Sequence, residues 1–485
     1  MTIEVAAVAD ALREAGLLER SVRGLPQRVS GITDDSRAVT PGSMFVAVRG
    51  TAADGHLFLG PAASSGASVA VVEDASLTKL PALVVTDSRA AAAVAAAAAY
   101  AYPARELRIV GVTGTNGKTT TAALLRALLD EDASPSASIG TLGVLIGREG
   151  RPTPGGAGLT TPGPVELQRL LRELADSGVR SIAMEVSSHS LDQGRVAGLR
   201  FVAAVFTNLT RDHLDYHQTM EAYFEAKAKL ISYLVPEGVA VVNSEESGWA
   251  GLPPAPRKFL FGRRGDLRVS AIQQSLAGTA FDLTYEGIAH RVELPLIGEF
   301  NVENAAAAAG AALQLGVPME TVVSRLSAAP QVPGRLEILA RQPTIIRDYA
   351  HTPDALERVL KALKRMCDGR LIVVFGCGGD RDKGKRPLMG AIACAHADVA
   401  IVTSDNPRTE DPEKIIDDVV AGMKSAEYER MEDRHAAIER AIDLAGAADV
   451  VVIAGKGHET YQIRGTTRHP FDEKEIVSEI LAGRA

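Results

Sequence analysis

The segment Gly111-Val-Thr-Gly-Thr-Asn-Gly-Lys-Thr-Thr120 leaves few choices of fold. The apolar run Leu107–Val112 predicts a strand that enters it, and the pattern from Thr119 to about Asp130 predicts a helix that leaves it. Glycines in such a turn let backbone N–H groups face phosphate oxygens, while a lysine reaches the outer phosphates and a hydroxyl can bind Mg²⁺. The spacing is not a strict Walker A pattern, since its first glycine would fall at Val112. We nevertheless expect a nucleoside triphosphate site here rather than an incidental glycine-rich turn.

Polar groups follow the next two strands that the sequence predicts. Glu185 lies near the end of the mostly apolar run Ser181–Val186, and His213 lies shortly after the run Phe201–Thr207. Beside a phosphate loop, a carboxylate and an imidazole can hold Mg²⁺ against a γ-phosphate. Each is also common as a structural hydrogen-bonding residue, and the spacing alone leaves both interpretations open. Lys227 has a helical pattern around it, which by itself favours a solvated helix face.

The chain divides into three blocks by pattern. Residues 1–108 combine short strand-like runs with an alanine-rich helix around residues 88–101, and residues 109–332 contain the phosphate loop. Residues 333–485 follow a segment rich in proline and glycine, and they alternate strands with helices as parallel sheets do. The expected fold class is therefore α/β in three domains: a small N-terminal α/β domain, a central P-loop domain with a mostly parallel sheet, and a C-terminal Rossmann-like domain.

The third block has two predicted helix starts, at Thr352-Pro353 and Asp411-Pro412, where a capping residue precedes a proline. Its four predicted strands are Thr344–Asp348, Arg370–Phe375, Asp398–Thr403 and Asp449–Ala454, and a polar loop follows each of them. In a parallel sheet these loops would share the edge at which ligands bind. The loops are Tyr349–Pro353, Gly376–Arg386, Ser404–Arg408 and Gly455–Glu459. The Arg408 guanidinium is a candidate to bind a carboxylate with two parallel hydrogen bonds, although the preceding pair Asn406-Pro407 also favours a simple turn. The basic stretch Arg381–Arg386 fits an exposed turn as well as it fits an anion clamp.

Composition limits the function classes. A net charge of −8 over 485 residues argues against general adhesion to nucleic acid or anionic lipid. The longest apolar run, Ala90–Ala101, is too short to span a bilayer, and the N-terminal residues show no secretory pattern. Cys367, Cys377 and Cys394 fit no zinc or disulfide spacing. We therefore expect a cytoplasmic protein that binds neither nucleic acid nor membrane. We also expect it to act on small molecules and to be a monomer.

Taken together, these motifs resemble the Mur ligase family of peptidoglycan precursor synthesis. The resemblance covers essentially the whole chain. It is carried by Thr113–Thr120, Met184–Ser190, Thr207–His217, Gly298–Asn304 and Gly455–Glu459. It implies an ATP-dependent, ADP-forming acid–amino-acid ligase, which adds meso-2,6-diaminopimelate to the D-glutamate of UDP-N-acetylmuramoyl-L-Ala-D-Glu through an acyl phosphate. A lysine-adding member, a folylpolyglutamate synthase, a P-loop ATPase of another function and an idle scaffold of the same fold are the alternatives.

The resemblance also implies roles for individual residues. Lys118, Glu185, His213 and Lys227 would be catalytic, with Mg²⁺ held by Thr119, Glu185, His213 and a CO₂-derived carbamate on Lys227. ATP would be bound by Gly114, Thr115, Asn116, Gly117, Lys118, Thr119, Thr120, Asn301, Asn304, Arg335, Asp348 and His351. The UDP-linked substrate would meet Asp34, Ser36, Thr51, Ala52, Ala53, Thr160, Thr161, Ser187, Gln193 and Arg195. Diaminopimelate would meet Arg381, Asp405, Asn406, Pro407, Arg408, Gly455 and Glu459, with Arg408 binding the second carboxylate and Glu459 an ammonium.

Overall fold

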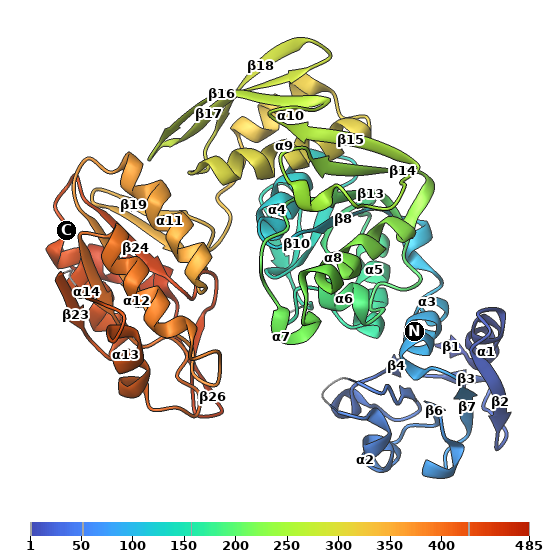
Figure 1. Ribbon diagram of the computed structural model, residues 1–485. Coiled ribbons are helices and arrows are strands. Elements are labelled where there is room, and N and C mark those ends of the chain that lie inside the picture. The colour runs from blue at the N-terminus through green and yellow to red at the C-terminus, as the bar shows by residue number, and fades with distance from the viewer. Residues whose placement is uncertain (1, 51–52, 157, 425–426, 485) are drawn as a thin grey trace. The chain divides into compact units, whose positions relative to one another are not determined.

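The computed structural model describes residues 2–50, 53–156, 158–424 and 427–484. It separates into two compact units. The first comprises residues 1–269, 284–288 and 303–325, and the second comprises residues 270–283, 289–302 and 326–485. Figure 1 shows the elements of both units along the chain. None of the helices in the described ranges is long and apolar enough to cross a membrane.

The N-terminal part of the first unit is a small sheet with helices. Its strand order is β2-β7-β6-β5-β4, parallel except for β2, and β1 pairs separately with β3. The strands are β1 (Ile3–Glu4), β2 (Leu18–Val22), β3 (Arg28–Val29), β4 (Ile32–Thr33), β5 (Met44–Val46), β6 (Val69–Val72) and β7 (Ala82–Val85). The helices are α1 (Val5–Glu14), α2 (Leu59–Ser64) and α3 (Ser88–Ala99). Asp87 caps α3 by accepting from two backbone N–H groups, and the buried alanines of α3 pack on β6 and β7.

The central part of the first unit is built on a parallel sheet. Its strands run in the order β9-β12-β8-β13-β14-β15, with β10 and β11 added antiparallel beside β9. The strands are β8 (Arg108–Thr113), β9 (Ser136–Gly140), β10 (Gly143–Ile146), β11 (Arg151–Thr153), β12 (Ser181–Glu185), β13 (Phe201–Phe206), β14 (Leu234–Asn243) and β15 (Arg257–Gly262). The helices are α4 (Lys118–Leu129), α5 (Pro164–Asp176), α6 (Ser188–Asp192), α7 (Leu214–His217) and α8 (Met220–Ala228). Because β8 lies between β12 and β13, the loops that follow these three strands share one edge.

Several elements here have no counterpart in the sequence analysis. They are β14 and β15, the later strands β16 (Leu267–Ser275), β17 (Gly278–Tyr285) and β18 (Ile288–Leu294), and the helices α9 (Glu299–Gln314) and α10 (Met319–Ser327). In β17 buried residues alternate with partly exposed ones, the pattern of a strand with one solvated face.

The second unit carries a six-stranded sheet in the order β19-β20-β24-β21-β22-β23, parallel except for β19. Its strands are β19 (Glu337–Arg341), β20 (Thr344–Asp348), β21 (Leu371–Phe375), β22 (Val399–Val402), β23 (Glu427–Arg430) and β24 (Val450–Ala454), with a hairpin of β25 (Tyr461–Arg464) and β26 (Thr467–Pro470). Its helices are α11 (Pro353–Met366), α12 (Lys385–His396), α13 (Pro412–Val420), α14 (Arg434–Leu444) and α15 (Glu473–Ala482).

Alternate residues of these strands face opposite layers of helices. Leu371, Val373 and Phe375 of β21 pack with α11, α12 and α13, whereas Ile372 and Val374 pack with α14 and α15. The predicted helix starts are confirmed, because Thr352 and Asp411 each accept a backbone N–H just before a proline. The four predicted strands of this block lie in one sheet within a residue of their predicted ends, so the four polar loops do share an edge.

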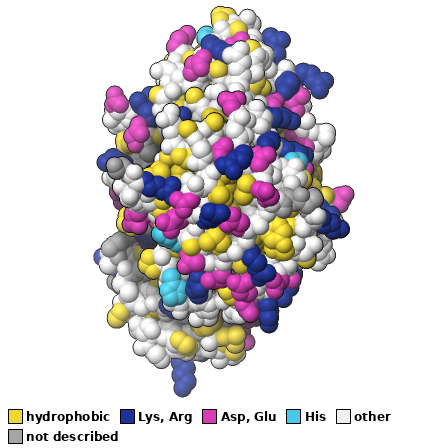
Figure 2. Space-filling model, turned by 90° about the vertical axis from the view of Figure 1, so that its left-hand side faces the viewer, with side chains coloured by type: hydrophobic (Ala, Val, Ile, Leu, Met, Phe, Trp, Pro, Cys, Tyr) yellow, Lys and Arg dark blue, Asp and Glu magenta, His cyan; other side chains and the backbone are white. Residues whose placement is uncertain are grey.

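Charged side chains are mixed on the visible surface. On the face drawn in Figure 2, Lys and Arg side chains are interspersed with Asp and Glu rather than collected into a patch of one sign. This distribution agrees with the modest net charge of the sequence.

Candidate functional site

The phosphate loop lies between β8 and α4, as the sequence predicts. Gly114 has φ +145°, and a Cβ there would overlap the Thr207 side chain at the end of β13. Gly117 has φ +84°, and a Cβ there would overlap the Asn304 side-chain oxygen. Only glycine combines these backbone angles with so little space. The two glycines therefore allow the chain to turn tightly ahead of α4, whose N-terminal N–H groups suit an anion.

The loop is braced from β13 by side chains that the sequence analysis did not single out. The amide oxygen of Asn208 accepts from the Asn116 N–H at 2.8 Å, and the Thr207 hydroxyl donates to the Asn116 carbonyl at 2.7 Å. Thr115 donates through its hydroxyl to the Thr210 carbonyl at 3.0 Å. These contacts fix the shape of the loop. Asn208 and Thr210 lie within the Thr207–His217 motif, so their proximity to the loop follows from the parallel order of β8 and β13.

Lys118 lies over the loop's own carbonyl groups. Its ammonium donates to the Gly114 carbonyl at 2.9 Å and to the Thr115 carbonyl at 2.7 Å. Lys227, from the C-terminal end of α8, donates to the same Gly114 carbonyl at 2.7 Å. Two lysine amines therefore converge on one oxygen of the phosphate loop.

Lys227 is 1% exposed, and the solvated helix face expected from its spacing alone is wrong. Its amine lies 4.4 Å from the centre of the Tyr223 ring, which is itself fully buried. Burial, with the nearby Lys118 charge adding to it, lowers the pKa of Lys227 well below its ordinary value. Spacing could not reveal this, because α8 is covered by the phosphate loop, which comes from a distant part of the chain.

Glu185 is buried at the end of β12 and faces the start of α4. Its carboxylate accepts from the Thr119 hydroxyl at 3.0 Å and from the Thr141 backbone N–H and hydroxyl at 2.8 and 3.2 Å. Thr141, which no sequence pattern marked, follows β9 on the neighbouring side of β12. The carboxylate and the Thr119 hydroxyl thus present oxygen donors at the phosphate loop, of the kind that Mg²⁺ prefers.

His213 lies in a cluster of aromatic rings. Its ring centre is 4.8 Å from that of His189 and 6.2 Å from that of Tyr223, while its side chain is 46% exposed. His189 also contacts the rings of Tyr216 and His217, at centre-to-centre distances of 4.3 and 5.4 Å. Burial lowers the pKa of His189 to about 4, and the charges of the neighbouring histidines add to this shift. In the described part of the chain, no three His, Cys, Asp or Glu residues form a ready-made metal cluster, so a metal here would need ligands of other types.

The residues predicted to hold the muramoyl dipeptide come together beside Glu185. The Thr161 hydroxyl donates to the Glu185 carbonyl at 2.9 Å and accepts from the Ser187 N–H at 3.1 Å. Arg195 donates to the Thr161 carbonyl at 3.2 Å and to Gln193 at 2.9 Å. Thr160 accepts from the Thr141 hydroxyl at 3.3 Å. This group is therefore one connected polar surface next to the phosphate loop.

The N-terminal residues predicted to meet the nucleotide of the substrate lie partly outside the description. Thr51 and Ala52 fall outside the described residues, and Ala53 is exposed. Ser36 begins a short 3-10 turn (Ser36–Ala38), which Asp35 caps by accepting from the Arg37 N–H. The Asp34 carboxylate lies 3.7 Å from the position of a Cβ on Gly163, two residues after Thr161. Asp34 is thus near the dipeptide surface of the same unit.

Within the second unit, the predicted nucleotide residues are close to one another. Asp348 is buried at the end of β20 and accepts from the Leu336 and Ala350 N–H groups, each at 2.8 Å. Burial raises the pKa of Asp348, and the charge of Arg335 opposes the shift. Arg335 lies 4.6 Å above the Tyr349 ring, which also contacts His351.

Asn301 is buried and donates to the Ile297 carbonyl at 2.8 Å, while Asn304 belongs to the first unit, where it contacts Thr121. Their roles toward ATP stay predictions.

The residues predicted to bind the amino acid form a second polar edge. Arg408 has φ +52° and donates to the Gly379 carbonyl at 2.8 Å, so two loops of this edge meet at its guanidinium. Asn406 donates through its side-chain amide to the Glu459 carboxylate at 2.8 Å. Asp405 lies close to Gly455, where a Cβ would come 2.7 Å from its carboxylate. Arg381 is exposed on the Gly376–Arg386 loop, and Pro407 lies between Asn406 and Arg408.

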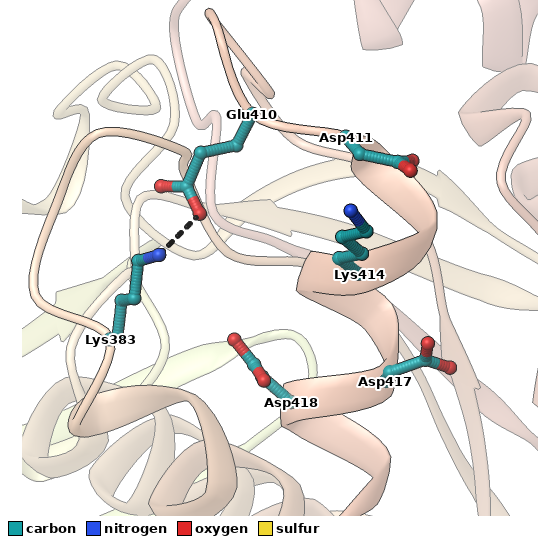
Figure 3. Close-up of a pocket in the computed structure, with 6 residues that line it drawn as sticks. All are labelled: Lys383, Glu410, Asp411, Lys414, Asp417 and Asp418. Atoms are coloured by element: carbon teal, nitrogen blue, oxygen red, sulfur yellow. Dashed lines mark ion pairs between the residues drawn. The ribbon is translucent and has the colours of Figure 1, made fainter.

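Glu410, which no sequence pattern marked, ties these two loops together. Its carboxylate accepts from Arg386 at 2.8 and 3.0 Å, from the Asp380 N–H at 2.6 Å and from Lys383 at 3.3 Å. Bonding to the buried Arg386 lowers the pKa of Glu410 to about 2. Figure 3 shows the Lys383–Glu410 pair across a surface hollow that is otherwise lined by residues of α13 and its cap. Four of the six residues that line the hollow are carboxylates, and none of the six is among the residues predicted to bind the amino acid.

Comparison with known proteins agrees with this geometry. The chain matches the family model described as "Mur ligase family, catalytic domain" over residues 28–111, "Mur ligase middle domain" over 112–312 and "Mur ligase, glutamate ligase domain" over 334–457. It is 43% identical to proteins from Chlorobaculum tepidum and Gloeobacter violaceus, both named UDP-N-acetylmuramoyl-L-alanyl-D-glutamate–2,6-diaminopimelate ligase. These alignments cover 94% and 98% of this chain, and 92% and 99% of the relatives.

Solved structures give the same picture. A structure of a UDP-N-acetylmuramoyl-L-alanyl-D-glutamate–2,6-diaminopimelate ligase has a TM-score of 0.69 and 36% identity, over 100% of this chain and 99% of that one. A MurF ligase from Thermotoga maritima, solved in complex with ADP, shares the fold at a TM-score of 0.65 and 20% identity, over 94% of this chain and 98% of that one. The family models together span most of the chain, and the motifs that resemble the family lie at the phosphate loop and at the two polar edges, so this chain belongs to the Mur ligase family.

Proposed function

We propose that this chain is an ATP-dependent ligase that adds meso-2,6-diaminopimelate to the D-glutamate of UDP-N-acetylmuramoyl-L-Ala-D-Glu, in peptidoglycan precursor synthesis. The relatives that cover nearly the whole chain carry the name of this activity. The structural observation that carries the proposal is the phosphate loop with the Glu185 carboxylate and the buried amine of Lys227 against it. Those groups suit phosphoryl transfer to a carboxylate.

In the proposed reaction, a carboxylate oxygen of the D-glutamyl residue attacks the γ-phosphorus of ATP, and ADP leaves. The amine of diaminopimelate then attacks the acyl carbon, the carbon–oxygen bond to phosphate breaks, and the amine loses a proton. Lys118, which bonds to loop carbonyls in this structure, supplies a positive charge that offsets charge on the transferring phosphoryl group. The polar surface around Thr161, Ser187 and Arg195 would hold the acceptor dipeptide beside it.

Mg²⁺ fits the chemistry of the donors at the loop. Thr119 and Glu185 offer oxygen atoms 3.0 Å apart, and His213 offers a ring nitrogen from the next loop. Bound Mg²⁺ offsets the negative charge of the phosphates. Lys227 would join this set if its amine took up CO₂ and released a proton, because the product would be a carbamate with two oxygens. The burial that lowers the pKa of Lys227 favours the neutral amine, which is the form that reacts with CO₂.

At the second polar edge, diaminopimelate offers two carboxylates and two amino groups. The Arg408 guanidinium can bind a carboxylate with two parallel hydrogen bonds, and the Glu459 carboxylate can accept from an ammonium group. L-Lysine lacks the second carboxylate, so Arg408 would favour diaminopimelate over lysine. We further propose that the domains are residues 1–108, 109–332 and 333–485, and that the chain acts in the cytoplasm as a monomer.

The acyl phosphate is tested with ¹⁸O. The D-glutamyl carboxylate of the acceptor is labelled, and the released phosphate is analysed by mass spectrometry. An acyl phosphate leaves one carboxylate oxygen on the phosphate, so labelled phosphate supports the proposal. Product that forms with unlabelled phosphate would overturn the acyl-phosphate route.

A further inference from the structure

Lys456 is fully buried, although it lies in one of the loops at the amino-acid edge. It follows β24 between Gly455 and Glu459, and its side chain is 0% exposed. Its ammonium donates to the Asn406 side-chain oxygen at 3.1 Å and to the Glu459 carboxylate at 3.3 Å. Removing an ammonium group from water is costly unless it is paired. The groups with which Lys456 pairs are two of the residues proposed to bind the amino acid.

These contacts set the orientation of the Asn406 amide. Its oxygen accepts both from Lys456 and from the Ile463 N–H, the latter at 2.9 Å. An ammonium group and a backbone N–H can only donate, so the oxygen must face them. The amide nitrogen is then directed toward Glu459, to which it donates at 2.8 Å.

The same contacts fix the Glu459 carboxylate. Asn406 and Lys456 both donate to its Oε2 atom, at 2.8 and 3.3 Å. Two donors that converge on one oxygen resist rotation of the carboxylate. Behind this group, the backbone of the loop is held by the buried Arg434, which donates to the Ala454 carbonyl at 2.9 Å and pairs with Glu473. The loop therefore presents a carboxylate of fixed direction at the edge of the sheet.

We infer that Lys456 is a positioning residue for the amine substrate, acting through Asn406 and Glu459. This inference rests on the proposed function, because it takes Asn406 and Glu459 as contacts of the incoming amino acid. A carboxylate already held in its binding direction loses less conformational freedom when an ammonium group docks on it. Lys456 therefore acts on the binding of the amino acid and leaves the binding of ATP unchanged.

The test compares Lys456→Met with Arg347→Met in steady-state phosphate release. Arg347 is a matched control: it is also buried in the second unit, and it pairs with Glu337 at 2.6 Å and Asp472 at 3.1 Å rather than with Asn406 or Glu459. For Lys456→Met we expect the KM for diaminopimelate to rise about tenfold or more, with the KM for ATP within about twofold of wild type. Arg347→Met is expected to lower the melting temperature and to leave both KM values near wild type.

A double-mutant cycle tests whether the effect passes through Glu459. In a Glu459→Gln background, Lys456→Met is expected to raise the KM for diaminopimelate by less than it does alone. Lys456→Gln keeps a hydrogen-bond donor on a side chain that is one atom shorter and carries no charge. It serves as the second variant if Lys456→Met does not fold, and we expect its KM to lie between wild type and Lys456→Met.

The outcomes separate the two proposals. An unchanged KM for diaminopimelate in a folded Lys456 variant, or fully additive effects in the cycle, would overturn the positioning role and leave the proposed function intact. Wild-type protein that releases no phosphate in response to diaminopimelate would instead overturn the proposed function.

Discussion

Replacement of Gly117 by alanine tests the structure of the phosphate loop, with Gly178 as a matched control. Both glycines have a left-handed φ, +84° and +92°. A Cβ at Gly117 would overlap the Asn304 side-chain oxygen, whereas a Cβ at Gly178 would have nothing within 4 Å. The backbone cost, about 1–2 kcal/mol, is therefore common to both variants.

The additional cost at Gly117 comes from Asn304. This side chain must move, which breaks its 3.4 Å contact with the Thr121 hydroxyl. Loss of one such hydrogen bond costs about 0.5–1.5 kcal/mol. At roughly 2–4 °C per kcal/mol for a domain of this size, Gly117→Ala should melt about 1–6 °C below Gly178→Ala.

The assay is thermal melting followed by ADP titration in a calorimeter. Gly117→Ala should also bind ADP at least about tenfold more weakly, because a misplaced loop misdirects its N–H groups. Gly178→Ala should bind ADP as the wild type does. Equal melting temperatures and equal ADP affinities for the two variants would refute the reasoning that Gly117 shapes the loop.

Three further predictions concern other parts of the site. Arg408→Ala should raise the KM for diaminopimelate about tenfold or more with the KM for ATP unchanged; steady-state kinetics with each substrate varied would check this, and a matching rise for ATP would contradict it. Glu410→Gln should lower the melting temperature and raise the KM for diaminopimelate, because the bonds to Arg386 and Asp380 hold the loop that contacts Arg408. The pKa of His189 is lowered to about 4 in the folded chain, so the unfolded chain binds this proton first as the pH falls below about 6.5. The free energy of unfolding should therefore drop between about pH 6.5 and 4. Melting curves of His189→Asn should show a weaker drop with pH, and a drop identical to that of the wild type would count against this prediction.

The sequence predicted those parts of the fold where local signals agree. The proline-led helix starts at Thr352 and Asp411, the strands of the last block and the phosphate loop all follow from capping residues, apolar runs and glycine spacing. It did not predict β16–β18, which are long but only half buried and therefore lack a clear apolar run. It did not predict β14 either, although residues 238–242 of that strand form a buried apolar run. The sequence also does not give the strand order, which places the loops after β8, β12 and β13 beside one another.

Side-chain burial was harder to predict, because it depends on contacts between distant segments. Spacing on α8 favoured a solvated Lys227, yet the phosphate loop covers it. The supporting residues Thr141 and Glu410 carry no motif of their own, and only the folded chain places them against Glu185 and Arg386. The resemblance to the Mur ligase family supplied the Lys227 role that the spacing could not.

The most direct test of the proposed activity is phosphate release from ATP with UDP-N-acetylmuramoyl-L-Ala-D-Glu, comparing meso-diaminopimelate, L-lysine and no amine. The account predicts rapid release only with diaminopimelate, because the Arg408 guanidinium recognises its second carboxylate. Preference for lysine would contradict the role given to Arg408. Equal release in every reaction, including those that lack the dipeptide, would contradict the ligase itself.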